Sequence, residues 1–198
     1  MYNDLDAGLD SFYDKTEIEK QKILAKILDY ANSAPNEFIT VVQSEGFNEP
    51  NHLPIFYEAL SKDLTKWADF FLSEINRLFE IAKTGSEPNK VLTYLNELSF
   101  IKPQNFKHRD MFVKILRQEL DTHIPIFRYY AINLLTDFVR KDDYSTINKV
   151  REYLKDFNWR IRYVSFLFLK DLEKLESYEK LSWTDKLRVN FMNPTKFE

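Results

Sequence analysis

Two stretches in the second half of the chain decide the fold: residues 124–140, IPIFRYYAINLLTDFVR, and residues 158–174, NWRIRYVSFLFLKDLEK. At a spacing of 34 residues, Arg128 corresponds to Arg162 and Asp137 to Asp171. The segments before them agree at the same spacing, in the pairs Val113/Ile147, Leu116/Val150, Arg117/Arg151 and Leu120/Leu154. One period of this size that relates two different segments is typical of stacked helical hairpins.

The repeated pattern resembles a HEAT repeat, in which an outer helix ending in leucines leads through a short Asp-containing loop into an inner helix. The inner helix opens with an apolar residue and an arginine, followed by a small residue and leucines. The first match is formed by Leu116, Leu120, Asp121, Pro125, Phe127, Arg128, Ala131 and Leu135. The second is formed by Leu154, Asp156, Ile161, Arg162, Ser165 and Leu169. The resemblance implies an α-solenoid, a fold that mostly serves as a binding scaffold, and it implies no reaction.

We therefore expect an all-α fold, a right-handed α-solenoid of stacked antiparallel helical hairpins with about nine to ten helices. A single domain would span residues 1–198, in four successive parts. These are an acidic arm (1–15), N-terminal helices (16–61), HEAT-like hairpins (63–176) and a capping helix (182–191). Within 63–100 the match is weaker, because Pro88 sits where Pro125 does but Val91 replaces the arginine.

Local signals predict where the helices begin and end. Capping boxes are expected at Thr16–Glu19 and Ser182–Asp185. Pro35 suits the first turn of a helix, which we expect to end at Gly46, and Gly85 should end a long helix that begins at Asp63. Further helices are predicted at 109–120, 124–140, 143–156 and 158–176.

Composition excludes several kinds of catalytic site. The 198 residues include no cysteine and only three glycines, so there is no thiolate nucleophile and no glycine-rich phosphate loop. The three histidines are isolated, and His108-Arg109-Asp110 lacks the context of a kinase catalytic loop. We expect no catalytic residue, no metal and no cofactor, although an active site assembled across the fold is left open. Without an apolar leader or a spanning segment, we expect a cytoplasmic protein with no membrane partner.

Charge is distributed unevenly along the chain. Residues 1–100 carry 9 Lys+Arg against 17 Asp+Glu, and residues 101–198 carry 19 against 14, which gives −8 and +5. The basic second half, together with Trp67, Trp159 and Trp183 as side chains that could stack on bases, supports a nucleic-acid-binding alternative of the DNA alkylation-repair kind. The overall pI of about 5.7 favours instead an acidic half that offsets a basic half within one fold.

The main hypothesis is a non-enzymatic scaffold that binds a protein or peptide through its inner-helix surface. The segment 158–176 is apolar around nearly its whole circumference, so a second face must be covered by the chain itself, by a partner or by another copy. Arg128 and Arg162 would grip carboxylates or phosphates, or would instead bond to loops of the neighbouring repeat. The interface candidates are Arg128, Tyr129, Ile132, Arg162, Tyr163, Phe166 and Leu167.

Overall fold

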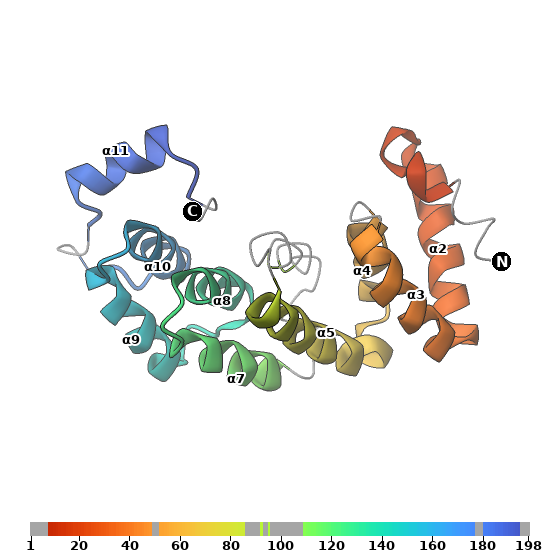
Figure 1. The fold of residues 1–198 in the computed structure, drawn as a ribbon, viewed down its shortest axis with the longest axis horizontal. Coiled ribbons are helices and arrows are strands. Elements are labelled where there is room, and N and C mark those ends of the chain that lie inside the picture. Colours follow the sequence, from red (N-terminus) through yellow and green to blue (C-terminus); the bar gives the residue numbers. More distant parts are fainter. Residues whose placement is uncertain are drawn as a thin grey trace. The chain divides into compact units, whose positions relative to one another are not determined.

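The computed structural model describes residues 8–48, 52–85, 92, 95, 109–176 and 180–194. Every regular element within these ranges is a helix, which confirms the all-α class, and the number of helices agrees with the prediction. The chain divides into two compact units, Met1–Asp69 and Phe70–Glu198, and the division falls within the long helix α5 (Leu64–Thr84) (Figure 1).

The first unit is built around the ring of Phe38. Its elements are η1 (Phe12–Asp14), α2 (Glu17–Ser33), α3 (Pro35–Asn48), α4 (Leu53–Ser61) and the start of α5. The helices α2, α3 and α4 pack against one another. The Phe38 ring makes edge-to-face contacts with the rings of Tyr30, Phe56 and Trp67, at centroid distances of 5.7, 5.7 and 6.0 Å.

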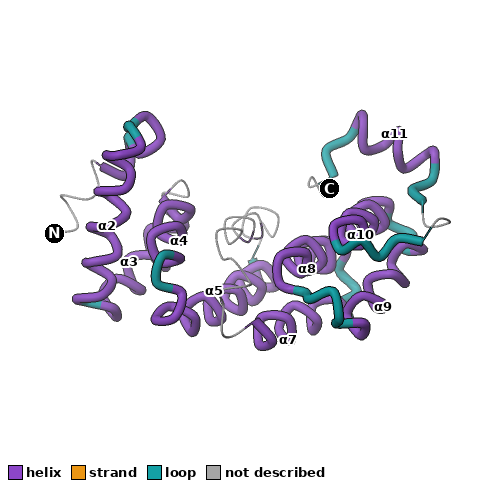
Figure 2. The backbone as a smooth tube through the Cα atoms, turned by 180° about the vertical axis from the view of Figure 1, so that it is seen from behind, coloured by secondary structure: helices purple, strands orange, loops and turns teal. Residues whose placement is uncertain are grey.

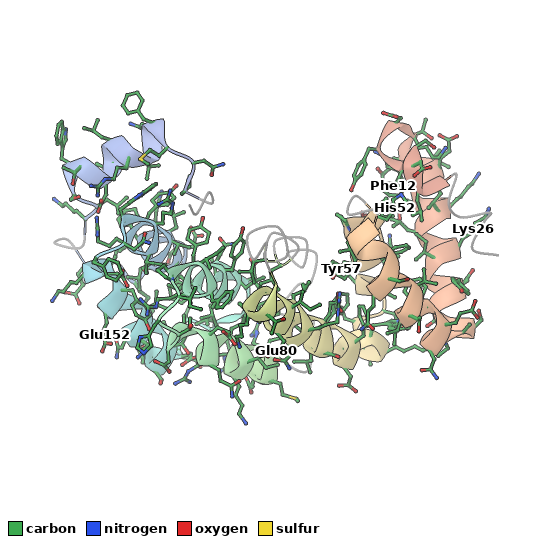
Figure 3. All side chains as sticks on the ribbon, in the orientation of Figure 1. Phe12, Lys26, His52, Tyr57, Glu80 and Glu152 are labelled. Carbon is green, nitrogen blue, oxygen red and sulfur yellow. The ribbon has the colours of Figure 1, made fainter. Side chains whose placement is uncertain are left out.

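The N-terminal segment docks onto this unit from residue 8 onward. Leu9 and Phe12 are buried, and Asp10 Oδ1 lies 3.1 Å from Nε2 of the buried His52. Figure 3 shows Phe12 and His52 at the same end of the unit. Apolar burial and one polar contact therefore hold residues that the sequence predicted only as an acidic arm.

In the first unit the predicted helix starts agree with the structure better than the predicted helix ends do. The capping box at Thr16 is present, and α3 begins at Pro35 as predicted. However, α3 continues to Asn48, so the prediction that Gly46 ends it is wrong. The α5 helix ends at Thr84, directly before Gly85, as predicted.

The second unit is a set of helices that pack in succession. They are α7 (Arg109–Leu120), α8 (Pro125–Phe138), α9 (Tyr144–Glu152), η5 (Tyr153–Lys155), α10 (Trp159–Asp171) and α11 (Trp183–Phe191). The helix α8 packs between α7 and α10, and α10 also contacts α9 and α11. In Figure 2 the purple tubes of α8 and α10 lie next to each other, both seen nearly end-on. The α7–α8 interface includes stacked rings of Phe112 and Phe138, with centroids 4.8 Å apart.

Three predicted boundaries in this unit need correction. The segment 124–140 forms the shorter helix Pro125–Phe138, and 143–156 divides into α9 and η5. The segment 158–176 is helical only to Asp171, because Glu173 adopts a positive φ of 56° and ends the helix. The helix predicted to begin at Pro88 lies outside the described residues.

The end of α10 is a Schellman motif without the usual glycine. The N–H of Lys174 donates to the carbonyl of Leu169, and the N–H of Glu173 donates to the carbonyl of Lys170. Glu173 therefore occupies the left-handed position that favours glycine. A side chain with a Cβ atom is strained there.

Replacing Glu173 with glycine should stabilise the second unit. We expect the free energy of unfolding to rise by about 1 kcal/mol, because glycine adopts the left-handed region without steric strain. The ion pair that is lost with Lys141 is exposed and contributes little. Denaturant titration measures the change, and Glu173→Ala is the matched control that keeps the Cβ. Equal stability of the two variants would contradict the assignment of strain to this residue.

Candidate partner-binding surface

The guanidinium of Arg128 is bonded within the chain. It donates from Nη2 to the carbonyl of Thr122 at 2.6 Å, and from Nη1 to the Asp156 carboxylate at 2.6 Å. It also lies over the ring of Tyr153, 4.7 Å from the centroid. The side chains of Arg128 and Asp156 are only 13% and 5% exposed. Arg128 therefore joins the loop before α8 to the loop before α10.

Arg162 repeats this arrangement at the next position. Its Nη1 donates to the carbonyl of Asp156 at 2.6 Å, which is six residues before it, as Thr122 is six residues before Arg128. Its Nε and Nη2 donate to the two oxygens of Asp185 in α11. We call this series of contacts, from Arg128 through Asp156 and Arg162 to Asp185, the Arg–Asp relay.

The relay holds α11 against α10 through a buried carboxylate. Asp185 is 1% exposed, and the hydrogen bonds from Arg162 keep its pKa below the usual range. The Ser182 hydroxyl accepts from the N–H of Asp185, which confirms the predicted N-cap of α11. The Asp185 carboxylate, expected to complete a capping box, instead accepts from Arg162 and Arg188.

The aromatic and aliphatic candidates fall into two groups. Ile132 is fully buried and Tyr129 is only 6% exposed, so these two belong to the interior of the second unit and present no surface. Burial raises the pKa of the Tyr129 hydroxyl to about 12. Tyr163, Phe166 and Leu167, by contrast, are half-buried on α10. Only these three of the apolar candidates are accessible to a partner.

The helices α8 and α10 run in the same direction with their equivalent residues adjacent. Tyr129 interacts electrostatically with Tyr163 near the start of the helices, and Asp137 with Asp171 near their ends. Both pairs are 34 residues apart. This arrangement brings matching side chains together on one face of the unit.

Two carboxylates therefore lie beside the accessible apolar side chains. Asp171 follows Leu167 by one turn of α10, and both aspartates are exposed. Although Asp137 has exposed surface, the protein atoms around its carboxylate partly desolvate it. This desolvation and the like charge of the neighbouring Asp171 raise the pKa of Asp137. We call Asp137, Tyr163, Phe166, Leu167 and Asp171 the inner-face patch. We did not include the two aspartates among the candidates, although their correspondence in the repeat was visible in the sequence.

Two adjoining cavities, of about 280 and 220 Å³, lie between α7 and the turn after α8. Both are lined by Asp110, Val113 and Asp143. Asp143 caps α9 through the N–H of Thr146. The charges around the cavities are largely compensated, so we assign them no ligand.

Several basic side chains of the second unit are paired with acidic ones. Besides the relay, ion pairs join basic side chains to acidic ones at Lys83–Glu119, Arg140–Asp142, Lys141–Glu173 and Lys149–Asp121. Arg128 and Arg162, which belong to the basic half that the nucleic-acid alternative would use, are held in the relay. Trp159, one of its stacking candidates, is 8% exposed.

The comparisons with known proteins give the chain no relatives. No protein-family model, no curated protein and no solved structure matches it significantly. Within the described ranges no helix is both long enough and apolar enough to cross a membrane. The same residues contain no group of three or more His, Asp or Glu side chains that could hold a metal ion.

Replacing Asp185 with asparagine should release α11 from α10. We expect a loss of about 1–3 kcal/mol in the local stability of α11, because the substitution weakens charged hydrogen bonds to Arg162. Amide hydrogen exchange over residues 183–191 measures this loss. The matched control is Asp142→Asn, which breaks an exposed pair and should have little effect.

The same contact should make α11 sensitive to acid. Because the folded-state pKa of Asp185 is lowered, its contribution is present at neutral pH. That contribution is lost as the pH falls below about 4, the unfolded-state value, towards the folded-state pKa. The difference between the wild type and Asp185→Asn should shrink over that range. An unchanged difference in acid would show that the ionised carboxylate does not hold the helix.

Proposed function

We propose that this protein is a HEAT-like helical-repeat scaffold that binds a protein or peptide through the inner-face patch. In this proposal residues 109–176 are two stacked hairpins of a right-handed solenoid, with α7 and α9 as outer helices and α8 and α10 as inner helices. The 34-residue period and the equivalent contacts of Arg128 and Arg162 support this assignment. The role is binding, and no reaction is assigned to the surface.

The observation that carries the proposal is the composition of the patch. Tyr163, Phe166 and Leu167 offer apolar surface that the other helices leave half covered. Apolar and aromatic side chains of this kind form the centres of protein interfaces. Asp137 and Asp171 are neighbouring carboxylates, and a cation placed between them would relieve their repulsion. The preferred partner is therefore an apolar segment that carries a lysine or an arginine.

Leu167→Asp should abolish partner binding and leave the fold intact, because Leu167 is half-buried and the new carboxylate can reach solvent. Phe166→Asp should act in the same way. Val164→Asp is the contrast on the same helix, because Val164 is 2% exposed and a carboxylate there should unfold the unit. Circular dichroism and thermal melts compare the three variants. Unfolding by both Leu167→Asp and Phe166→Asp would show that this face is interior and would contradict the proposal.

A selection from a random peptide library tests the binding chemistry. Peptides that bind the wild type but not Leu167→Asp should be enriched in large apolar residues and in Lys or Arg. They should bind more weakly as the salt concentration rises. No enrichment, or enriched peptides that bind both proteins equally, would count against the patch.

Nucleic-acid binding stays a prediction that rests on the basic second half of the sequence. Its test is a fluorescence-anisotropy titration with duplex and single-stranded DNA at two salt concentrations. Phosphate contacts would give affinity that falls steeply with salt. Absence of binding at low salt would exclude this alternative.

A further inference from the structure

The helix α11 is inverted relative to an ordinary surface helix, because its buried residue is charged and its largest apolar residues are exposed. Asp185 is 1% exposed, whereas Trp183, Leu187 and Phe191 are 73%, 36% and 83% exposed. These three follow one another at steps of four residues and so lie along one side of the helix. We call them the α11 stripe. In Figure 3 large side chains project from α11 on the side away from α10.

Basic side chains flank this stripe. Lys186 and Arg188 are exposed and stand one residue before and after Leu187, which places them about 100° to either side of it on the helix. Exposed apolar surface rimmed by polar residues marks an interaction site. Arg188 also donates to the Asp185 carboxylate of its own chain at 3.2 Å, so Lys186 is the flanking charge that favours an acidic occupant.

The second unit itself contains a surface of the complementary kind. The inner-face patch combines the apolar side chains of Tyr163, Phe166 and Leu167 with the carboxylates of Asp137 and Asp171. Within one chain the stripe does not cover this patch, since Trp183 and Phe191 face solvent while Arg162 and Asp185 hold α11 at its N-terminal end. The patch of another copy is free to receive it.

We propose that the α11 stripe of one copy docks on the inner-face patch of a second copy, so that molecules associate head to tail. This inference rests on the binding role proposed for the patch, and it names an occupant. Trp183, Leu187 and Phe191 would pack on Tyr163, Phe166 and Leu167 of the second copy. Lys186 would approach its two aspartates.

Charge and area set the character of this contact. Pairing of two α11 stripes with each other is disfavoured, because Lys186 and Arg188 would meet the same cations of the other copy. Three side chains offer on the order of 400 Å², which is about half of the roughly 800 Å² per partner in a stable interface. The association is therefore weak and reversible. Because each copy carries one stripe and one patch, it extends into chains or closes into rings.

The chain contains its own reporter for this contact. Trp67 and Trp159 are 4% and 8% exposed, so the solvent-exposed part of the tryptophan emission comes from Trp183. Raising the concentration from about 10 µM to about 500 µM at low salt should shift the emission to shorter wavelength and raise the weight-average mass in sedimentation. High salt should reverse both changes.

The decisive experiment mixes two variants, one that lacks a functional α11 stripe and one that lacks a functional inner-face patch. Phe191→Asp disables the stripe and Leu167→Asp disables the patch, so each variant alone should remain monomeric. An equimolar mixture should form dimers and nothing larger, because one intact stripe meets one intact patch. Met111→Asp is the control at an exposed site on α7, and it should associate as the wild type does.

Each other outcome overturns the proposal in an identifiable way. A wild type that stays monomeric at the highest concentration shows that the stripe does not bind a second copy. Association of Leu167→Asp alone points to pairing between stripes. If Phe191→Asp and Leu167→Asp are monomeric both separately and when mixed, the α11 stripe does not bind the inner-face patch. Peptide selection distinguishes failure of this inference from failure of the binding role, because selected peptides can bind the patch in a monomer.

Discussion

The Arg–Asp relay is the constraint on which the second unit depends. Each guanidinium bonds to a carbonyl of the loop before its own helix. Arg128 also bonds to the carboxylate of Asp156 in the loop before α10, and Arg162 to that of Asp185 in α11. Asp156 also accepts the backbone N–H of Asn158 at 2.7 Å, so the same carboxylate shapes the loop that leads into α10. Because these groups are largely withdrawn from water, removing one partner would leave a buried charge uncompensated. The relay therefore fixes where α8, α10 and α11 begin relative to one another.

The relative positions of residues along α8 and α10 are consistent with this constraint. Both arginines are held by equivalent loop carbonyls, and Tyr129 lies near enough to Tyr163, and Asp137 to Asp171, for each pair to interact electrostatically. Partial desolvation and the like charge of Asp171 both disfavour the ionised form of Asp137 and raise its pKa. The free energy gained in the buried contacts of α8 and α10 outweighs this local cost. In the proposed function, the same pair becomes the recognition element for a cationic segment.

The relay also accounts for the inverted character of α11. Asp185 lies on the polar side of α11 and accepts a hydrogen bond from Arg162 of α10. This contact holds the polar side of α11 towards α10. With the polar side inward, Trp183 and Phe191 are left in solvent. This orientation links the internal electrostatics of the unit to the surface proposed for self-association.

The sequence by itself determined the all-α class, the N-caps at Thr16 and Ser182 and the helix end at Gly85, because these depend on residues close together in the chain. It also indicated, through the 34-residue period, which residues would be equivalent. Only the tertiary structure decided that Ile132 lies inside while Leu167 remains accessible, since a helix apolar on several sides gives no signal of which side is covered. Only the tertiary structure likewise showed that Asp156 is the acidic partner of Arg128 and Asp185 that of Arg162. These partners lie 28 and 23 residues away in the sequence, and no local rule selects them.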